Sequence, residues 1–334
     1  MGDSGTYNIF TGHLGHLSSS QEEALVAFKR QLAEAKLYDP EQPSLDDPTL
    51  LRFLRARSFS VAGALKQFSD FDKWRREHDV DNLYTTFDSA ELENSRRFYP
   101  RWTGRRDKAS NSPLFSAVHF MVHRMACLST CTTSRPWIPP SRRNCMPHHP
   151  NAATNGCGYS YCLQLNPNNI KPTSIALYEW MVRFTLPLCS FLPHPTETPI
   201  TCVVTIIDLQ DVSIGSMWTL RSHLSESAKL ATANYPETLS TIAIVNAPSF
   251  FPTIWGWIKG WFDPGTRNKI HILGKNPAET LLKLIDAQDL PRQYGGTLEW
   301  EFADEPSLDD ATKQAIGEMP KGPTVFVDGK VAKP

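Results

Sequence analysis

The second half of the chain alternates short apolar runs rich in β-branched residues with longer segments of helical periodicity, and this alternation constrains the fold more than any other feature. Three runs of strand length read TCVVTIIDL, STIAIVNA and NKIHIL. Helical patterns begin at Ser174, Ser216 and Pro277. We expect the first of these helices to end at Pro187, because proline lacks the backbone donor that a helix interior needs. Strands that alternate with helices of this length predict a mixed sheet covered by helices.

The first hundred residues have the pattern of a small helical unit. A serine and two acids open SSSQEEALVAFKRQLAEAKL, Asp46 and Asp47 precede PTLLRFLRAR, and Ser60 precedes VAGALKQFSDFDKW. Side chains that accept a hydrogen bond at the first turn are typical helix starts. The sequence therefore predicts helices over about 20–95.

The segment between these halves has an unusual composition. No Asp or Glu occurs from Ala109 to Tyr178, and the segment TSRPWIPPSRRNCMPHHP is rich in proline and arginine. We interpret about 109–171 as an irregular insertion or a mis-spliced segment. Cysteine and histidine side chains that could in principle bind zinc cluster here: Cys127, Cys131, Cys145, His148, His149, Cys157 and Cys162. Their spacing matches no regular zinc knuckle, so we expect reduced thiols and no metal site.

An aromatic stretch, FFPTIWGWIKGWFDP, begins at Phe250. On a helix it forms two adjacent apolar stripes, Phe251, Trp255, Ile258 and Phe262 beside Ile254, Trp257 and Trp261. Both stripes could be core. Alternatively, one side faces an internal cavity and the other faces lipid headgroups, where tryptophan is enriched. Two glycines, Gly256 and Gly260, lower the stability of such a helix, which suits an element that moves.

Composition and motifs exclude several classes of function. The formal net charge of -1 argues against a nucleic-acid binder that depends on a strong basic field. The N-terminus predicts no signal peptide and fits a myristoylation pattern only loosely, and seven cysteines without a secretion signal predict a cytosolic setting. The stretch GYSYC lacks the second glycine of a hydrolase elbow, and neither a phosphate loop nor HExxH occurs. We therefore expect no enzyme.

Several motifs are similar to those of the CRAL-TRIO lipid-binding family, and within it to the fungal phosphatidylinositol/phosphatidylcholine transfer proteins. They include LLRFLRARSFSVAGA, KWRREHDV, FYPRWTGRRDK, YEWMVRFTLPLCS, TIIDLQDVS, ATANYPETLSTIAIVNAPSFFPTIWGWIKGWFDP and LPRQYGG. The resemblance covers about 12–108 and 173–300. It implies an α/β fold with a helical N-terminal lobe (12–100) and a lipid-binding domain (101–305), whose mixed sheet and flanking helices enclose a lipid pocket. A flexible tail (306–334) is expected to follow.

The resemblance also implies the residues of a lipid site. The headgroup residues would be Arg57, Glu237, Thr266 and Lys269, although Arg57 could equally brace the lobe. A gate helix would present Phe250, Phe251, Ile254, Trp255, Trp257, Ile258, Trp261 and Phe262. Thr205 would be a polar pocket residue. Because Val203 stands where the family's choline pocket has serine, phosphatidylinositol is expected ahead of phosphatidylcholine.

The function implied is non-enzymatic binding and transfer of a phospholipid by a monomer, with no cofactor other than the bound lipid. The implied setting is cytoplasmic and peripheral at membranes of Golgi or endosome type, with a lipid kinase as a candidate partner and no nucleic acid. Two alternatives stay open: a protein-interaction module of the same fold with a vestigial pocket, and a carrier of a sterol, retinoid or tocopherol. An esterase lacks a nucleophile.

Overall fold

The N-terminal lobe is helical, as the sequence predicts. The computed structural model describes residues 10–41, 45–96, 99–108, 118–124, 172–194 and 197–334. The lobe contains α1 (Ser19–Glu34), α2 (Asp47–Ala56), α3 (Val61–Glu77), α4 (Val80–Thr86) and α5 (Ser89–Ser95). Ser18, Asp46 and Ser60 accept hydrogen bonds at the N-termini of α1, α2 and α3, which confirms the expected helix starts.

A mixed sheet forms the centre of the second domain, which confirms the predicted fold class. Its strands are β1 (Arg101–Arg106), β2 (Val118–Arg124), β3 (Cys202–Asp208), β4 (Leu239–Val245) and β5 (Ile270–Gly274), in the spatial order β1-β2-β3-β4-β5. β1 runs antiparallel to β2, and the other neighbours are parallel.

Strand β2 lies inside the stretch that the sequence analysis interprets as irregular. It pairs with β3 from Val118 opposite Cys202 to Arg124 opposite Asp208. That interpretation is therefore wrong for 118–124, where backbone groups are satisfied by ladder bonds to two strands distant in sequence. The stretches 109–117 and 125–171, with all the cysteines and histidines considered for zinc, lie outside the described residues.

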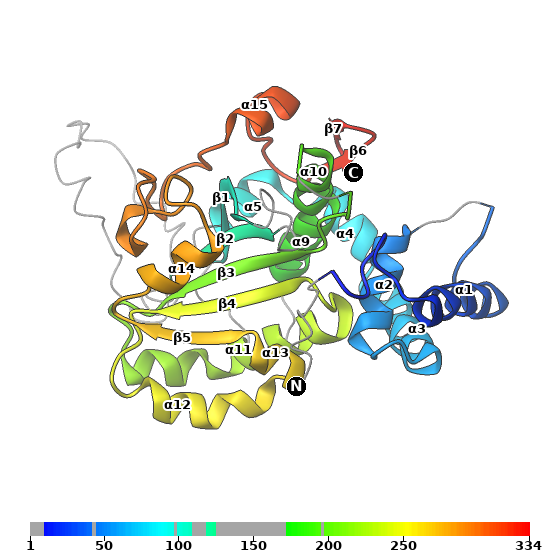
Figure 1. Ribbon diagram of the computed structural model, residues 1–334, viewed down its shortest axis with the longest axis horizontal. Helices are drawn as coiled ribbons and strands as arrows, with labels where there is room; N and C mark the ends of the chain where they lie inside the picture. Colours follow the sequence, from blue (N-terminus) through cyan, green and yellow to red (C-terminus); the bar gives the residue numbers. More distant parts are fainter. Residues whose placement is uncertain (1–9, 42–44, 97–98, 109–117, 125–171, 195–196) are drawn as a thin grey trace, which may run out of the picture.

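Helices cover both faces of the sheet (Figure 1). One face packs against α9 (Pro172–Trp180), the π-helical turn η2 (Met181–Thr185), α10 (Leu186–Phe191) and α14 (Ala278–Leu284). The other face packs against α11 (Ile214–Asn234) and α12 (Phe251–Ile258), followed by η3 (Lys259–Trp261) and α13 (Pro264–Asn268). Side chains alternate between the faces, so Val204 and Ile206 join the first core while Ile207 joins the second.

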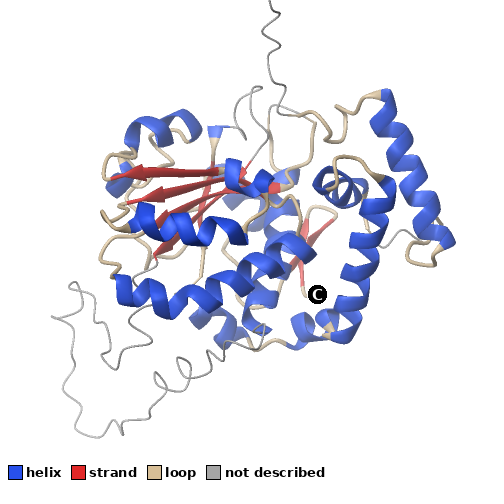
Figure 2. Ribbon diagram, turned by 90° about the horizontal axis from the view of Figure 1, so that it is seen from below, coloured by secondary structure: helices blue, strands red, loops and turns tan. Residues whose placement is uncertain are grey.

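Helices α1, α2 and α3 of the N-terminal lobe lie at one end of the sheet and cover neither face (Figures 1 and 2), whereas Tyr84 of α4 and Leu92 of α5 join the core on the side of α9. The three helices lie at the end from which β3, β4 and β5 start. Gln67 of α3 fixes this position by donating to the backbone oxygens of Thr232 and Ala233, in the last turn of α11, at 3.0 and 3.1 Å. Lobe residues consequently meet the amino ends of the parallel strands.

The helix expected to end at Pro187 continues to Phe191. A π-helical turn precedes the proline, and Leu186 donates its backbone N–H to Met181, five residues earlier. Proline is tolerated in the first turn of a helix, and Pro187 occupies that position in α10. The wider turn thus restarts the helix where the sequence pattern predicts a stop.

The C-terminal region is ordered, so the expectation of a flexible tail over 306–334 is wrong. It contains the helix α15 (Asp310–Ile316) and a hairpin of β6 (Val325–Val327) and β7 (Lys330–Ala332). Phe326 is buried against Phe191, and the Tyr84 hydroxyl donates to the backbone oxygen of Thr324 at 2.6 Å. These contacts with distant residues compensate for the polar composition that suggests disorder.

Candidate functional site

A charged cluster forms where α2 of the lobe meets the starts of β4 and β5. Arg55 Nη2 lies 3.4 Å from Glu237 Oε2, and Lys269 Nζ lies 3.1 Å from the same oxygen. Lys269 also donates to the backbone oxygen of Leu239 at 2.9 Å, and Arg55 donates to the Thr201 hydroxyl at 3.4 Å. Because Arg55 and Glu237 are 182 residues apart in sequence, only tertiary folding assembles this cluster.

The turn that carries Glu237 has an uncommon backbone conformation. It follows α11, and Glu237 has a φ of 55°, in the left-handed region. A residue with a Cβ pays an energetic cost of roughly 1–2 kcal/mol there, so surrounding contacts must hold the turn. One of them is the hydrogen bond from the Thr238 hydroxyl to the backbone oxygen of Tyr235, at 2.9 Å. Such local strain is typical of functional sites.

The cluster carries two positive charges against one negative charge. Burial alone would raise the pKa of Glu237, but Lys269 and Arg55 outweigh it and lower the pKa. The carboxylate is thus ionised at neutral pH, and the cluster has an excess of one positive charge. Its side chains are only partly exposed, at 11% for Arg55 and 28% for Lys269, which makes it suited to an anionic group that is largely withdrawn from water.

The structure brings Arg55 into this cluster in place of the expected Arg57. Arg57 is exposed and donates only to the backbone oxygen of Ala56, at 3.5 Å. It caps the C-terminus of α2, whereas Arg55 follows the buried Leu51 at i+4 and shares its face. The spacing of four residues from a buried leucine therefore distinguishes Arg55 from Arg57, whereas the motif alone does not.

Thr266 lies three residues before Lys269 on α13, but its side chain already has a partner. Its hydroxyl donates to Asp263 Oδ2 at 2.6 Å, and its backbone N–H donates to Oδ1 of the same residue at 3.0 Å. Asp263 therefore caps α13 and also accepts the hydrogen bond of the Thr266 hydroxyl. A ligand contact would require the hydroxyl to exchange Asp263 for the ligand.

The aromatic stretch forms α12 and η3. The α-helix ends at Ile258, about one turn before Phe262, the last residue of the two expected stripes. Phe251 and Ile254 are buried, one from each expected stripe, while Trp257 is 62% exposed. The other residues that the resemblance assigns to a gate helix are half-buried: Phe250, Trp255, Ile258, Trp261 and Phe262. The stripes end early because the α-helix stops at Ile258, after which the 3-10 turn changes the angular spacing.

The sheet face under α12 keeps some apolar surface partly exposed on β4 and on the edge strand β5. Thr205, Ile242 and Ile270 pair in one row across β3, β4 and β5. Thr205 is buried, whereas both isoleucines are half-buried although they belong to the core between the sheet and α12. Part of the apolar surface of both isoleucines therefore remains accessible beside α12. A separate small cavity is lined by residues of α5, β1 and α9, among them Arg96, Trp102 and Trp180, and lies away from α12.

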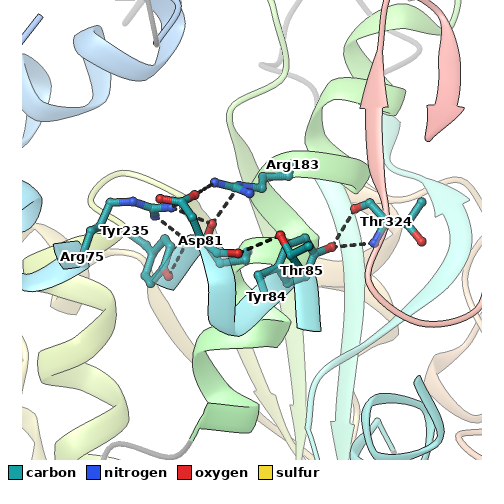
Figure 3. Close-up of polar contacts among 8 residues, drawn as sticks. Arg75, Asp81, Tyr84, Thr85, Arg183, Tyr235 and Thr324 are labelled. Atoms are coloured by element: carbon teal, nitrogen blue, oxygen red, sulfur yellow. Dashed lines mark hydrogen bonds and ion pairs between the residues drawn. The ribbon is translucent and has the colours of Figure 1, made fainter. Parts of the chain in front are cut away.

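A second polar network supports the turn that carries Glu237 (Figure 3). At its centre is Glu179 of α9, whose side chain is fully buried. Arg75 of α3 donates to Glu179 at 2.8 and 3.2 Å, Arg183 of η2 at 2.9 Å, and the Tyr235 hydroxyl at 2.7 Å. Burial and the Glu179 charge raise the pKa of Tyr235 well above its usual value, so the phenol remains a donor.

Asp81 of α4 extends this network by pairing with both Arg75 and Arg183. The network thus joins α3 and α4 of the lobe to α9 and η2 and, through Tyr235, to the turn two residues before Glu237 (Figure 3). The motif YEWMVRF contains Glu179 and Arg183 at i and i+4, yet its spacing reveals neither Arg75 nor Tyr235 as partners. Sequence reasoning missed this network for that reason.

Across the described helices, none combines the length and the apolar character that a membrane span needs. Among the residues that the structure describes, no three His, Cys, Asp or Glu side chains lie close enough together to bind a metal ion.

Comparisons with known proteins relate the chain to one family. A model described as the CRAL/TRIO domain matches residues 158–296, and one described as the CRAL/TRIO N-terminal domain matches residues 14–70. The chain is 30% identical over 289 residues to the protein named Sec14 cytosolic factor of Schizosaccharomyces pombe, covering 86% of each chain. It is 28% identical over 257 residues to the phosphatidylinositol/phosphatidylcholine transfer protein SFH4 of Arabidopsis thaliana, covering 76% of this chain and 36% of that protein.

A solved structure shares the fold at lower sequence identity. The crystal structure of Sfh5 superposes with a TM-score of 0.54 at 16% identity, covering 89% of this chain and 91% of that one. At this identity the similarity shows the fold alone.

Proposed function

This chain belongs to the CRAL/TRIO family, and from that premise we propose that it binds a phospholipid and transfers it between membranes without chemistry. Phosphatidylinositol is the preferred ligand in this proposal, and phosphatidylcholine is second. Relatives named Sec14 cytosolic factor and phosphatidylinositol/phosphatidylcholine transfer protein support this class of function.

The observation that carries the proposal is the position of the charged cluster relative to the apolar sheet face. Glu237 and Lys269 precede β4 and β5, and the half-buried Ile242 and Ile270 follow on those same strands. A phosphodiester needs cationic donors, and its acyl chains need apolar walls. The cationic donors and the apolar side chains lie next to each other along β4 and β5, as the phosphate and the acyl chains do in a phospholipid, and this arrangement supports the proposal. Glu237 would accept hydrogen bonds from headgroup hydroxyls, and Lys269 would bind the phosphate.

Energetics explain why a movable cover is needed. Bringing two acyl chains into water costs about 0.8 kcal/mol per CH2, or about 25 kcal/mol for a phospholipid. Hydrogen bonds to a charged headgroup contribute only about 1.5–3 kcal/mol each. The chains must therefore pass directly from the bilayer to the protein. We assign the cover to α12 and η3, whose Trp257 already points toward solvent and would enter the headgroup layer.

Glycines in the cover supply a specific test of this movement. An added Cβ would meet no atom within 4 Å at Gly256 or Gly260, so alanine fits at both positions. Alanine stabilises a helix by about 1 kcal/mol relative to glycine. We expect Gly256→Ala and Gly260→Ala each to slow vesicle-to-vesicle transfer about fivefold, because opening must loosen a more stable helix. The amount of lipid that copurifies should stay unchanged.

The control for this prediction is Gly215→Ala, in the first turn of α11, where the nearest contact of an added Cβ is 3.8 Å away. It should leave the transfer rate near that of the wild type. Transfer by the Gly256 and Gly260 variants at the wild-type rate would contradict a gate that opens by loosening α12.

Lipid extraction and native mass spectrometry of the purified protein test the proposed function itself. We expect one phospholipid per chain, enriched in phosphatidylinositol relative to the host membrane. A copurified sterol or another isoprenoid would instead indicate a different carrier. A chain without lipid that purifies with a protein partner would contradict the proposal and support the interaction module.

The setting of the protein belongs to the same proposal. We place it in the cytoplasm, peripheral at membranes of Golgi or endosome type, where a lipid kinase would receive the transferred phosphatidylinositol. The name cytosolic factor, which relatives such as that of Schizosaccharomyces pombe carry, supports the cytoplasmic part of this proposal. Fluorescence microscopy of a tagged chain, with organelle markers, tests the membrane.

A further inference from the structure

The N-terminal turn lies against the arginine of the charged cluster. Backbone bonds close it from His13 to Phe10 and from His16 to His13, each at 2.9 Å. Gly12, with a φ of 82°, lies so close that an added Cβ would be 3.4 Å from Cγ of Arg55. The turn therefore packs on the side chain that pairs with Glu237.

His13 presents an unused acceptor in this turn. Its side chain is buried, with 8% of the residue exposed. Nδ1 lies 3.2 Å from the backbone oxygen of Phe10, and because a carbonyl only accepts, Nδ1 carries the proton. Nε2 then holds a lone pair. It is buried and has no hydrogen-bond partner in the described part of the chain.

Burial and the nearby charges of the cluster keep His13 neutral. Burial and the Arg55 charge lower the pKa of His13 to about 4, while Glu237 acts in the opposite direction. An imidazole with this pKa is uncharged at pH 7, so Nε2 remains an acceptor. Leaving a buried acceptor unpaired costs about 1–3 kcal/mol.

The polar groups of the site divide by role. Arg55 and Lys269 are donors only, which suits a phosphate. Glu237 accepts, but one of its oxygens already binds both cations. A headgroup with several hydroxyls could use a second acceptor besides the remaining oxygen of Glu237, whereas a headgroup without hydroxyls could not.

We propose that Nε2 of His13 accepts a hydrogen bond from a hydroxyl of a polyol-phosphate headgroup and thereby selects hydroxylated headgroups. This inference rests on the proposed function and adds a specificity residue to its site. The same chemistry occurs in phosphatidylinositol and in free inositol phosphate, which the experiment separates.

The test compares binding of phosphatidylinositol and phosphatidic acid, which shares the phosphate but lacks headgroup hydroxyls. His13→Phe keeps a planar ring and removes the acceptor. We expect it to weaken phosphatidylinositol binding about tenfold, which corresponds to about 1.4 kcal/mol, and to leave phosphatidic acid binding unchanged. His13→Gln, whose amide oxygen reaches the position of Nε2, should recover most of the loss. His16→Phe, an exposed position in the same turn, serves as the matched control and should change neither.

A second measurement uses the wild-type chain and does not depend on how the variants fold. The ¹⁵N signal of His13 Nε2 should shift on loading with phosphatidylinositol and stay in place on loading with phosphatidic acid. No shift with either lipid would overturn the inference, as would equal losses for both lipids in His13→Phe. Wild-type protein that binds neither lipid would instead refute the proposed function. If free myo-inositol 1-phosphate binds as tightly as phosphatidylinositol, the ligand is the free polyol phosphate and not the lipid, which would overturn this part of the inference.

Discussion

Lys269→Ala is expected to reduce transfer of phosphatidylinositol to background while the fold survives. Lys269 supplies one of the two cations of the cluster and lies at the start of β5, where its side chain is 28% exposed. A hydrogen bond between charged groups contributes about 1.5–3 kcal/mol, so its removal should weaken headgroup binding by roughly 10- to 150-fold. It would also leave Glu237 with one cation and cancel the positive excess. The measurement is transfer of labelled phosphatidylinositol between vesicles, with circular dichroism to confirm the fold.

Two exposed arginines near the cluster provide controls for this prediction. Arg267→Ala lies two residues away on α13, and Arg57→Ala removes the arginine that the motif suggests but the structure places in solvent. Both variants should transfer lipid at close to the wild-type rate. Normal transfer by Lys269→Ala would refute the headgroup assignment, and loss of transfer in Arg57→Ala would restore the motif-based one.

Glu179→Ala is expected to destabilise the protein by about 3–5 kcal/mol. Its fully buried carboxylate receives hydrogen bonds from Arg75, Arg183 and Tyr235, so its removal leaves two guanidinium groups without their buried partner. Removal of one member of a buried ion pair typically has a cost of this size. Urea unfolding followed by tryptophan fluorescence measures the change in the unfolding free energy.

The control for Glu179→Ala is the exposed pair of Lys66 and Asp70, one turn apart on α3. Surface pairs contribute about 0–1 kcal/mol, so Asp70→Asn should shift the unfolding midpoint little. A loss in Glu179→Ala as small as that in Asp70→Asn would contradict a structural role for the network. Because Tyr235 belongs to the turn that carries Glu237, the Glu179 variant should also weaken phosphatidylinositol binding at temperatures where it remains folded.

Local patterns were sufficient for much of the architecture. Ser18, Asp46 and Ser60 mark helix starts because a cap is made within three residues of its own chain. The apolar run that forms β3 can be recognised because a strand buried on both faces requires continuous apolar residues, and β4 and β5 are short β-branched runs of the same type. The aromatic helix α12 and two members of the cluster, Glu237 and Lys269, lie in motifs that resemble those of the family.

Other elements depend on partners that local patterns do not contain. Strand β2 forms in a stretch of unpromising composition because β1 and β3 lie on either side of it. The C-terminal hairpin is ordered because Phe326 reaches Phe191 and because Tyr84 binds the backbone of Thr324. Each of these contacts gains free energy only after the rest of the chain has folded.

The sequence by itself determined the class of fold, the helices of the lobe, the strands after Pro172 and the presence of an aromatic helix, since periodicity and caps act over a few residues. Tertiary structure alone decided that Arg55 meets Glu237, that Glu179 joins the lobe to the turn before Glu237, and that the N-terminal turn of His13 packs on Arg55. The physical reason is that charges and hydrogen bonds act over a few ångströms in space, and the residues that make them here are separated by tens to hundreds of positions along the chain.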